Sequence, residues 1–319
     1  MFTTLRNAWK IPELRKKILF TLFVLLIYRL GACVPVPYVN VAELTTYFQQ
    51  QLSGTVLGLY NAMSGSAFSQ ATIFAIGIQP YINASIIIEL LAIAIPALER
   101  LAKEGGEEGQ KKIQRITRYT TVGLGLLMGW AYYMMLRNYS SQISIITSEG
   151  LLPALVIILA FTAGSALVMW LGEQINEKGI GNGISFIIFA SIVSSVPQVI
   201  VSMVSNVMLG TYKWWILPVL IVFVLIMVAG VVAVDRAVRR IPVQYAKRVV
   251  GRKMYGGQST NIPLKANANG VMPLIFAMTL MQVPGMIGQF WPNSGFYQFY
   301  QKYLIPGTTA VGGIVYYVI

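Results

Sequence analysis

The chain of 319 residues is unusually apolar and also basic. Hydrophobic side chains make up 56% of it and charged side chains 11%, with a net charge of +13, whereas globular chains have about 45–50% and about 25%. It contains no histidine and one cysteine, which excludes a Ser-His-Asp triad, a His-ligated metal site, an internal disulfide and a CxxC motif. This composition excludes a disordered chain, a disulfide scaffold and an ordinary soluble enzyme domain.

Long apolar runs predict a polytopic membrane protein, because a helix needs about 20 apolar residues to cross a bilayer. A last apolar segment begins near Gly307 and has about 13 residues before the sequence stops, so we expect the chain to end inside an eighth helix. A half-apolar stretch, residues 55–69, precedes the second span. The predicted spans are 18–34, 71–95, 116–136, 151–171, 180–204, 214–234 and 271–290.

The loops between these spans differ in positive charge from one side to the other. Lys and Arg number five in residues 1–17, six in 96–118, one in 172–179 and eight in 235–268. The four segments on the opposite side hold three in total. Cytoplasmic loops carry the excess of Lys and Arg, so this pattern predicts a cytoplasmic N-terminus.

Two ionisable residues lie well inside predicted spans, Arg29 and Glu89. Such residues are costly in a membrane and indicate function by default. We expect Arg29, near the outer end of its helix, to snorkel toward the interface. Glu89 could face a water-filled cavity or pair with a cation on a neighbouring helix. Two such positions are few for a proton-coupled transporter, and no carboxylate pair or activated nucleophile accompanies them, so we expect no enzyme.

Two polar segments leave alternatives open. Glycines and serines break residues 52–77, which is typical either of a half-helix in a cavity or of a plain external loop. The basic loop, residues 235–268, interleaves Tyr245 and Tyr255 with its charges. It could record insertion orientation and lipid contact, or dock an acidic or RNA-containing partner. Gly125 and Gly129 form a GxxxG pattern that predicts a helix-packing face.

Residues 74–91 read FAIGIQPYINASIIIELL, and residues 170–185 read WLGEQINEKGIGNGIS. These motifs resemble the SecY family, the large subunit of the bacterial protein-conducting channel. The first is similar to the family's second-helix signature and the second to its link into the fifth helix. Tyr245-Ala-Lys-Arg, Gly251-Arg-Lys, Gln258-Ser-Thr and Pro263-Leu-Lys resemble its cytoplasmic loop between helices six and seven. The resemblance runs from about residue 10 to the end. Glu89 stands where many members have Gln.

The resemblance implies an all-α polytopic fold, an inverted-repeat bundle of two five-helix halves around an hourglass pore. Here it would comprise the first five helices, helices six and seven and the start of eight. The implied organisation is a cytoplasmic segment (1–17), a first half (18–204) and an incomplete second half (205–319) that includes the basic loop. A truncated chain is expected, because the last two helices are missing.

The implied function is the central pore subunit of the Sec channel in the bacterial plasma membrane. It would pass unfolded secretory chains and release apolar segments into lipid through a lateral gate, without a cofactor or metal. Implied partners are the SecE and SecG subunits, the SecA motor or the ribosome, nascent chains and lipids. The alternative is a secondary transporter of small solutes with inverted repeats.

The resemblance also assigns residues to four sites. The pore ring would be Ile82, Ile86, Ile184, Ile188 and Ile275. The plug, within residues 55–69, would include Leu59, Asn61, Met63, Ser64, Gly65, Ser66 and Phe68. The lateral gate would use Ile87, Leu90, Phe276, Thr279 and Met281. Docking of the ribosome or SecA would use Lys247, Arg248, Arg252 and Lys253.

Overall fold

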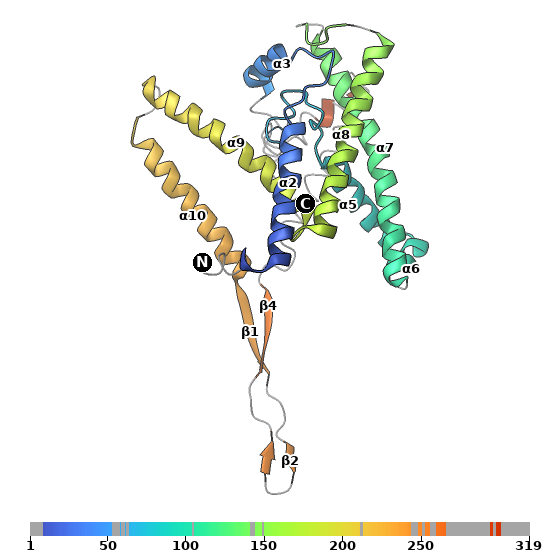
Figure 1. Ribbon diagram of the computed structural model, residues 1–319, viewed down its shortest axis with the longest axis vertical. Coiled ribbons are helices and arrows are strands. Elements are labelled where there is room, and N and C mark those ends of the chain that lie inside the picture. The colour runs from blue at the N-terminus through green and yellow to red at the C-terminus, as the bar shows by residue number, and fades with distance from the viewer. Residues whose placement is uncertain are drawn as a thin grey trace. The chain divides into compact units, whose positions relative to one another are not determined.

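The computed structural model, drawn as a ribbon in Figure 1, forms two compact units. The first comprises residues 1–197 and 279–319, and the second comprises residues 198–278. The chain is predominantly helical, as the sequence predicts. The residues that the structure describes are 9–52, 58, 61, 64–103, 105–140, 144–148, 150–210, 213–243, 248–250, 253–255, 260–265, 294–295 and 298–300.

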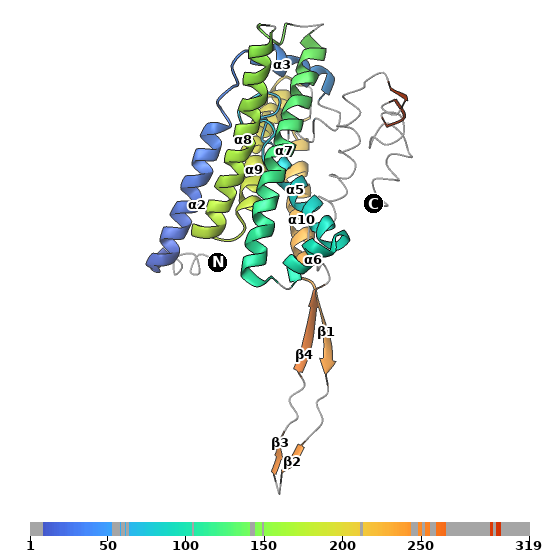
Figure 2. The ribbon, with the colours of Figure 1, turned by 90° about the vertical axis from the view of Figure 1, so that its right-hand side faces the viewer.

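The first unit is a helical bundle whose longest members are α7 and α8. Helices α2, α8 and α7 run side by side in this order (Figure 2), and α5 contacts both α7 and α8. Its elements are α2 (Pro12–Gly31), α3 (Val41–Tyr47), a π-helical turn η1 (Phe48–Leu52), α5 (Gln79–Ala94), α6 (Pro96–Lys103), α7 (Gly106–Ser140), α8 (Leu151–Lys178) and the first half of α9 (Gly183–Met208).

The face of α7 that packs on α8 is made of small and polar side chains. A Cβ at Gly125 would lie 2.9 Å from the Ser165 hydroxyl, and one at Gly129 would lie 3.2 Å from the Ile158 carbonyl oxygen. The predicted GxxxG packing face is therefore confirmed, since glycine at both positions lets the two backbones approach. The core beside this contact holds Phe161, which is fully buried and lies edge-on to Tyr132 with ring centroids 4.8 Å apart.

Five of the predicted spans each overlap a single helix along most of their length, but only some of these helices are strongly apolar. Within the described residues, α8, α9 and α10 (Ile216–Arg236) are long and apolar enough to cross a membrane, and α5 with α6 forms a fourth candidate if the bent pair is one span. Helices α2 and α7 fall outside this group. Charges occupy both ends of α2, and threonine, glycine and tyrosine recur along α7.

The second predicted span begins later than expected. Residues 64–78 form consecutive turns, and helix α5 starts at Gln79, with Pro80 in its first turn. Gly77 has φ +59°, a left-handed conformation that suits glycine and that separates the turns from the helix. Proline is favoured at this helix start because it has no N–H that would need a partner. A bend of 104° separates α5 from α6 at Ile95.

The second unit contains the end of α9, helix α10 and a long β-hairpin. Pro197 lies inside α9 where the two units divide. Two antiparallel pairs form the hairpin, β1 (Val238–Val243) with β4 (Thr260–Lys265), and β2 (Arg248–Val250) with β3 (Lys253–Tyr255). The all-α expectation therefore missed this ribbon. Proline at positions 242 and 263 obscures the strand pattern, although proline is tolerated where a strand has a free edge.

Candidate functional site

The turn segment, residues 64–78, is buried although it is not helical. Backbone hydrogen bonds join it to the chain after α2, from the Val36 N–H to the Ala71 carbonyl at 3.0 Å and from the Ile73 N–H to the Val34 carbonyl at 3.0 Å. The Tyr132 hydroxyl of α7 donates to the Phe68 carbonyl at 2.6 Å. The irregular backbone is thus paired inside protein, as it must be at membrane depth. A plain external loop, one of the two expectations, is wrong for these residues, and so is a helix.

Asn61 closes the start of this segment. Its side-chain oxygen accepts from the Ser69 N–H at 2.8 Å, and its carbonyl accepts from the Ser66 N–H at 2.9 Å and from the Ser64 hydroxyl at 3.0 Å. The Ser64 hydroxyl in turn accepts from the Phe68 N–H at 3.1 Å. One asparagine and one serine therefore satisfy several backbone groups and fix the path of the turns.

Gly65 brings the turn segment directly against α9. It is buried and has φ +65°. A Cβ at this position would lie 2.5 Å from the Ser194 hydroxyl oxygen and 2.7 Å from the Ser191 carbonyl oxygen. Any other residue would therefore strain the backbone and force α9 away. Glycine on one side and serines on the other permit this approach.

A small cavity lies between the turn segment, α5 and α9. Its volume is about 20 Å³, which is room for about one water molecule. Isoleucines from the turn segment, α5 and α9 supply its apolar wall, and α2, the turn segment, α5 and α9 each add a polar side chain. The lining residues are Tyr28, Ser64, Ile76, Gly77, Ile78, Gln79, Ile82, Ile187, Ile188 and Ser191.

The first turn of α9 is built by two asparagines. The Asn182 side-chain oxygen accepts from the N–H groups of the second and third residues after it, at 3.0 and 3.4 Å, as an N-cap does. The Asn176 side chain accepts from the Gly183 N–H at 2.7 Å. The Thr21 hydroxyl of α2 accepts from the Ile180 N–H at 3.2 Å, which ties this link to the first helix. Helix α9 thus begins at Gly183, within the motif that resembles the link into the family's fifth helix.

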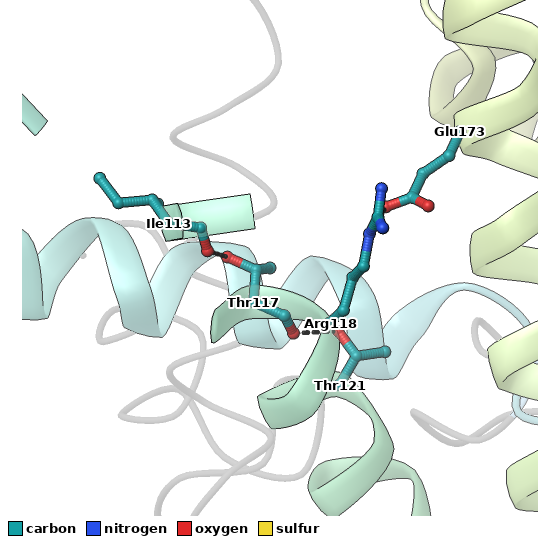
Figure 3. Close-up of polar contacts among 5 residues, drawn as sticks. All are labelled: Ile113, Thr117, Arg118, Thr121 and Glu173. Atoms are coloured by element: carbon teal, nitrogen blue, oxygen red, sulfur yellow. Dashed lines mark hydrogen bonds and ion pairs between the residues drawn. The ribbon is translucent and has the colours of Figure 1, made fainter. Parts of the chain in front are cut away.

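An ion pair joins α7 and α8 away from the turn segment (Figure 3). The Arg118 Nε lies 2.7 Å from the Glu173 Oε1, and the carboxylate side chain is 18% exposed. On the same stretch of α7, the Thr117 and Thr121 hydroxyls donate back to carbonyls one turn earlier, at 3.0 and 2.7 Å. These threonines pair their own hydroxyls within the helix, so the buried face of α7 carries no unpaired hydroxyl at these two positions.

Comparison with known proteins decides the family. Residues 72–319 match the family model of SecY. This chain belongs to the SecY family. Among curated relatives it is 45% identical over 296 residues to a protein translocase subunit SecY from Streptomyces griseus, covering 91% of this chain and 67% of the relative. It is 44% identical over 295 residues to one from Corynebacterium glutamicum, covering 91% and 66%. The chain thus spans about two thirds of the length of these relatives.

Solved structures show the same fold. A structure of a protein-conducting channel has a TM-score of 0.67 at 19% identity and covers 98% of this chain and 73% of its own. Sec61 in the canine ribosome–channel complex from the endoplasmic reticulum has 0.66 at 19% identity, with 98% and 74% covered. A SecY structure from work on the plug domain, which stabilises the closed state, has 0.59 at 20% identity, with 89% and 62% covered. The SecY-like membrane fold predicted from the sequence is confirmed.

In this SecY-family chain, the predicted plug residues that can be located lie together. Asn61, Ser64, Ser66 and Phe68 share the hydrogen bonds given above, and Gly65 lies between them in the chain, while Leu59 and Met63 fall outside the described residues.

The structure describes all of the predicted ring residues except one. Ile82 and Ile188 line the cavity, Ile86 is buried beside it on α5, and Ile184 is half-buried on α9. Ile187, which the sequence did not select, is 1% exposed and is the more deeply buried of the α9 isoleucines named here. Ile275 lies outside the described residues.

The gate and docking predictions are covered in part. Ile87 is half-buried and Leu90 is exposed on α5, with Glu89 exposed between them. None of the ion pairs found among the described residues includes Glu89. Arg248 and Lys253 lie in strands β2 and β3 at the far end of the hairpin. The remaining predicted residues lie outside the described ones: Phe276, Thr279, Met281, Lys247 and Arg252.

Sequence reasoning missed the polar contacts that hold the turn segment. Tyr28 and Ser191 are 163 residues apart, and Tyr132 lies 64 residues from Phe68. The available signal was the serine spacing in α9, where Ser191 and Ser194 sit one turn apart in an apolar run. Such small residues predict a close backbone approach but not its partner.

Proposed function

We propose that this chain is the central, pore-forming subunit of a protein-conducting channel. It passes unfolded secretory chains across the bacterial plasma membrane and releases their apolar segments into lipid through a lateral gate. The observation that carries this proposal is the buried turn segment, a non-helical stretch held between α2, α7 and α9 and next to isoleucines of α5 and α9. A removable stopper of this kind suits a channel that must stay sealed until a chain enters.

The ring residues suit such a seal. Ile82 and Ile86 are four residues apart and so share one face of α5, and isoleucine is stiff at χ1. With Ile184, Ile188 and Ile275 they would form an apolar collar that excludes water and ions. The collar offers a sliding chain no hydrogen-bond partners, so it would not retain that chain.

Release into lipid needs a side opening. Ile87 and Leu90 of α5 are proposed as one side of the gate, and Phe276, Thr279 and Met281 would form the other side. A passing apolar segment would leave through this opening at a gain of about 25 cal/mol per Å² of apolar surface buried. No chemical step by this subunit is required.

A transporter of small solutes is the less favoured alternative. Such a protein needs a solute-sized site near the middle of the membrane. The cavity between the turn segment, α5 and α9 has about 20 Å³, which suits about one water molecule. This volume is far below the several hundred Å³ of ordinary ligand pockets.

Orientation and partners follow from charge and family. The N-terminus and the basic loop are proposed to be cytoplasmic, since Lys and Arg concentrate on that side. Arg248, Arg252, Lys247 and Lys253 would then meet the SecA motor or the ribosome, and the SecE and SecG subunits would complete the channel. Reversing Arg248 and Arg252 to Glu should weaken SecA or ribosome binding to vesicles, most at low ionic strength. Lys213→Glu, on the opposite side, should leave that binding unchanged.

Site-specific cross-linking tests the central proposal. A photoreactive residue at Ile86 or Ile275 in the natural-length protein should cross-link to a secretory chain stalled in transit. Leu159, on the exposed side of α8, is the matched control and should not. Cross-linking at Leu159 alone, or solute uptake without any cross-link, contradicts the channel.

A further inference from the structure

Arg29, which the sequence predicts to snorkel toward the interface, contacts two neighbouring segments of the chain. Its Nη1 donates to the Ser194 hydroxyl of α9 at 3.1 Å and lies 3.5 Å from the Gly65 carbonyl oxygen of the turn segment. One guanidinium nitrogen therefore faces both an α9 side chain and the turn segment. Since a cation near membrane depth needs polar partners, these two oxygens explain why Arg29 can occupy this place.

The residue before it reinforces the same junction. The Tyr28 hydroxyl lies 2.7 Å from the Ser191 hydroxyl, and its ring stacks on Phe74 of the turn segment, with centroids 5.5 Å apart and planes 3° from parallel. Tyr28 thus holds α2 to α9 and to the turn segment independently of Arg29. Loss of the arginine alone should leave the helices in place.

The contact at Gly65 differs from the others because it involves a residue expected to move. The Ser194 hydroxyl also donates to the Ser191 carbonyl at 2.7 Å, so it is fixed by its own helix. If the turn segment leaves, Arg29 keeps Ser194 and loses the Gly65 carbonyl. The arginine therefore favours the seated position of the turn segment over the displaced one, which is what shifts a two-state equilibrium.

We propose that Arg29 is a positioning residue that holds the plug in its closed seat by joining the Gly65 carbonyl to Ser194 of α9. This inference rests on the proposed function, which identifies residues 64–69 of the turn segment as part of the plug. Arginine suits the role because its planar, permanently charged group can serve two acceptors at once. The Gly65 contact is a long hydrogen bond at 3.5 Å, so removing Arg29 should raise the displaced fraction about threefold.

The test measures where the turn segment lies. The natural-length protein, with exposed Cys33 replaced by serine, receives nitroxide labels at Ser66→Cys and at Val193→Cys, an exposed position on α9, and is placed in lipid nanodiscs. Pulsed electron resonance then gives the label-to-label distance. Arg29→Gln should add a second, longer distance population, and Arg29→Lys, which keeps the charge, should add less of it. Ser194→Ala should act in the same direction and more weakly.

Two control variants accompany this measurement, one expected to leave the distance unchanged and one expected to increase it. Arg118→Gln removes the same charge from a pair that does not touch the turn segment and should leave the distance unchanged. Gly65→Ala should displace the turn segment with Arg29 intact, because its Cβ would meet Ser191 and Ser194. An unchanged distance in Arg29→Gln, with Gly65→Ala displaced, overturns the proposal.

Ion conductance of the same variants separates this proposal from the proposed function. A displaced turn segment with a raised resting conductance supports both. A displaced turn segment with unchanged conductance upholds the positioning role of Arg29 and contradicts the identification of the segment as the plug. An undisplaced segment in a conducting Arg29→Gln channel overturns the positioning role alone.

Discussion

Among the described residues, the most apolar helix and the helix with the largest number of buried residues are different helices. α10 is a nearly continuous apolar run, yet none of its side chains is buried. α7, with its threonines, glycines and tyrosines, has eleven buried residues and supplies much of the core of the first unit. In a membrane, lipid is as apolar as leucine, so apolar surface gives helices no reason to associate. Packing goes instead to faces that are small or that can form hydrogen bonds.

The largest effect should come from emptying the core that α7 and α8 share. Phe161→Ala should destabilise the first unit by about 3 kcal/mol, because Phe161 is fully buried and lies edge-on to Tyr132. Unfolding by titration with sodium dodecyl sulfate in mixed micelles would measure this. Leu159→Ala, an exposed position on the same helix, should change the midpoint little; equal losses at both positions would contradict the contrast.

The next effect should come from one hydroxyl. Tyr132→Phe keeps the ring and removes the donor to the Phe68 carbonyl at 2.6 Å. The buried carbonyl then keeps only its longer bond from the Ala71 N–H at 3.2 Å, so the loss should cost about 1 kcal/mol. Proteolysis within the turn segment should also become faster, which a loss of ring packing alone would not explain. Tyr119→Phe, on the exposed face of α7, is the matched control.

A smaller effect should follow from removing the cap of α9. Asn182→Ala deletes the acceptor for two N–H groups and should cost about 1 kcal/mol, while Asn182→Ser should restore most of it. Amide hydrogen exchange at the start of α9 would report the change. Exchange that is as slow in the alanine variant as in the parent would show that the cap is not needed there.

The smallest effect should come from α10. Leu225 is 62% exposed, so Leu225→Ala should change stability by less than about 0.5 kcal/mol in the same detergent titration. A loss as large as that of Phe161→Ala would mean that α10 is packed against protein, and the contrast between the two helices would fail.

The sequence predicted the helices that contain a long apolar run. It misplaced the ends of helices where something other than hydropathy determines the end. α7 begins at Gly106, ten residues before the predicted span, because hydropathy marks the membrane-embedded part of a helix and not its polar extension. α5 begins eight residues late, since the apolar residues 71–78 are buried in turns. The hairpin was not predicted because its strands are basic and contain proline.

The residues of the site were predicted better than the contacts that hold the turn segment in place. Local motifs gave Gly65, Ile82 and Ile188, which the structure brings to one neighbourhood. The contacts of Arg29 with Gly65 and Ser194 could not be predicted, because they join segments 36 and 165 residues away. A single sequence carries composition and periodicity, but not the pairing of side chains distant along the chain.

The bend between α5 and α6 fixes how deep α5 can sit. With α5 crossing the bilayer, a turn of 104° leaves α6 nearly parallel to the membrane surface. Arg100 and Lys103 lie in its last turn, and Lys103 pairs with Glu99 at 2.7 Å. Sinking α5 by one turn would drag these charges into hydrocarbon, and raising it would pull Leu98 and Leu101 into water. The bend therefore limits how far α5 can move along the membrane normal. Helix α5 can tilt or swing sideways while its isoleucines stay at one level of the membrane.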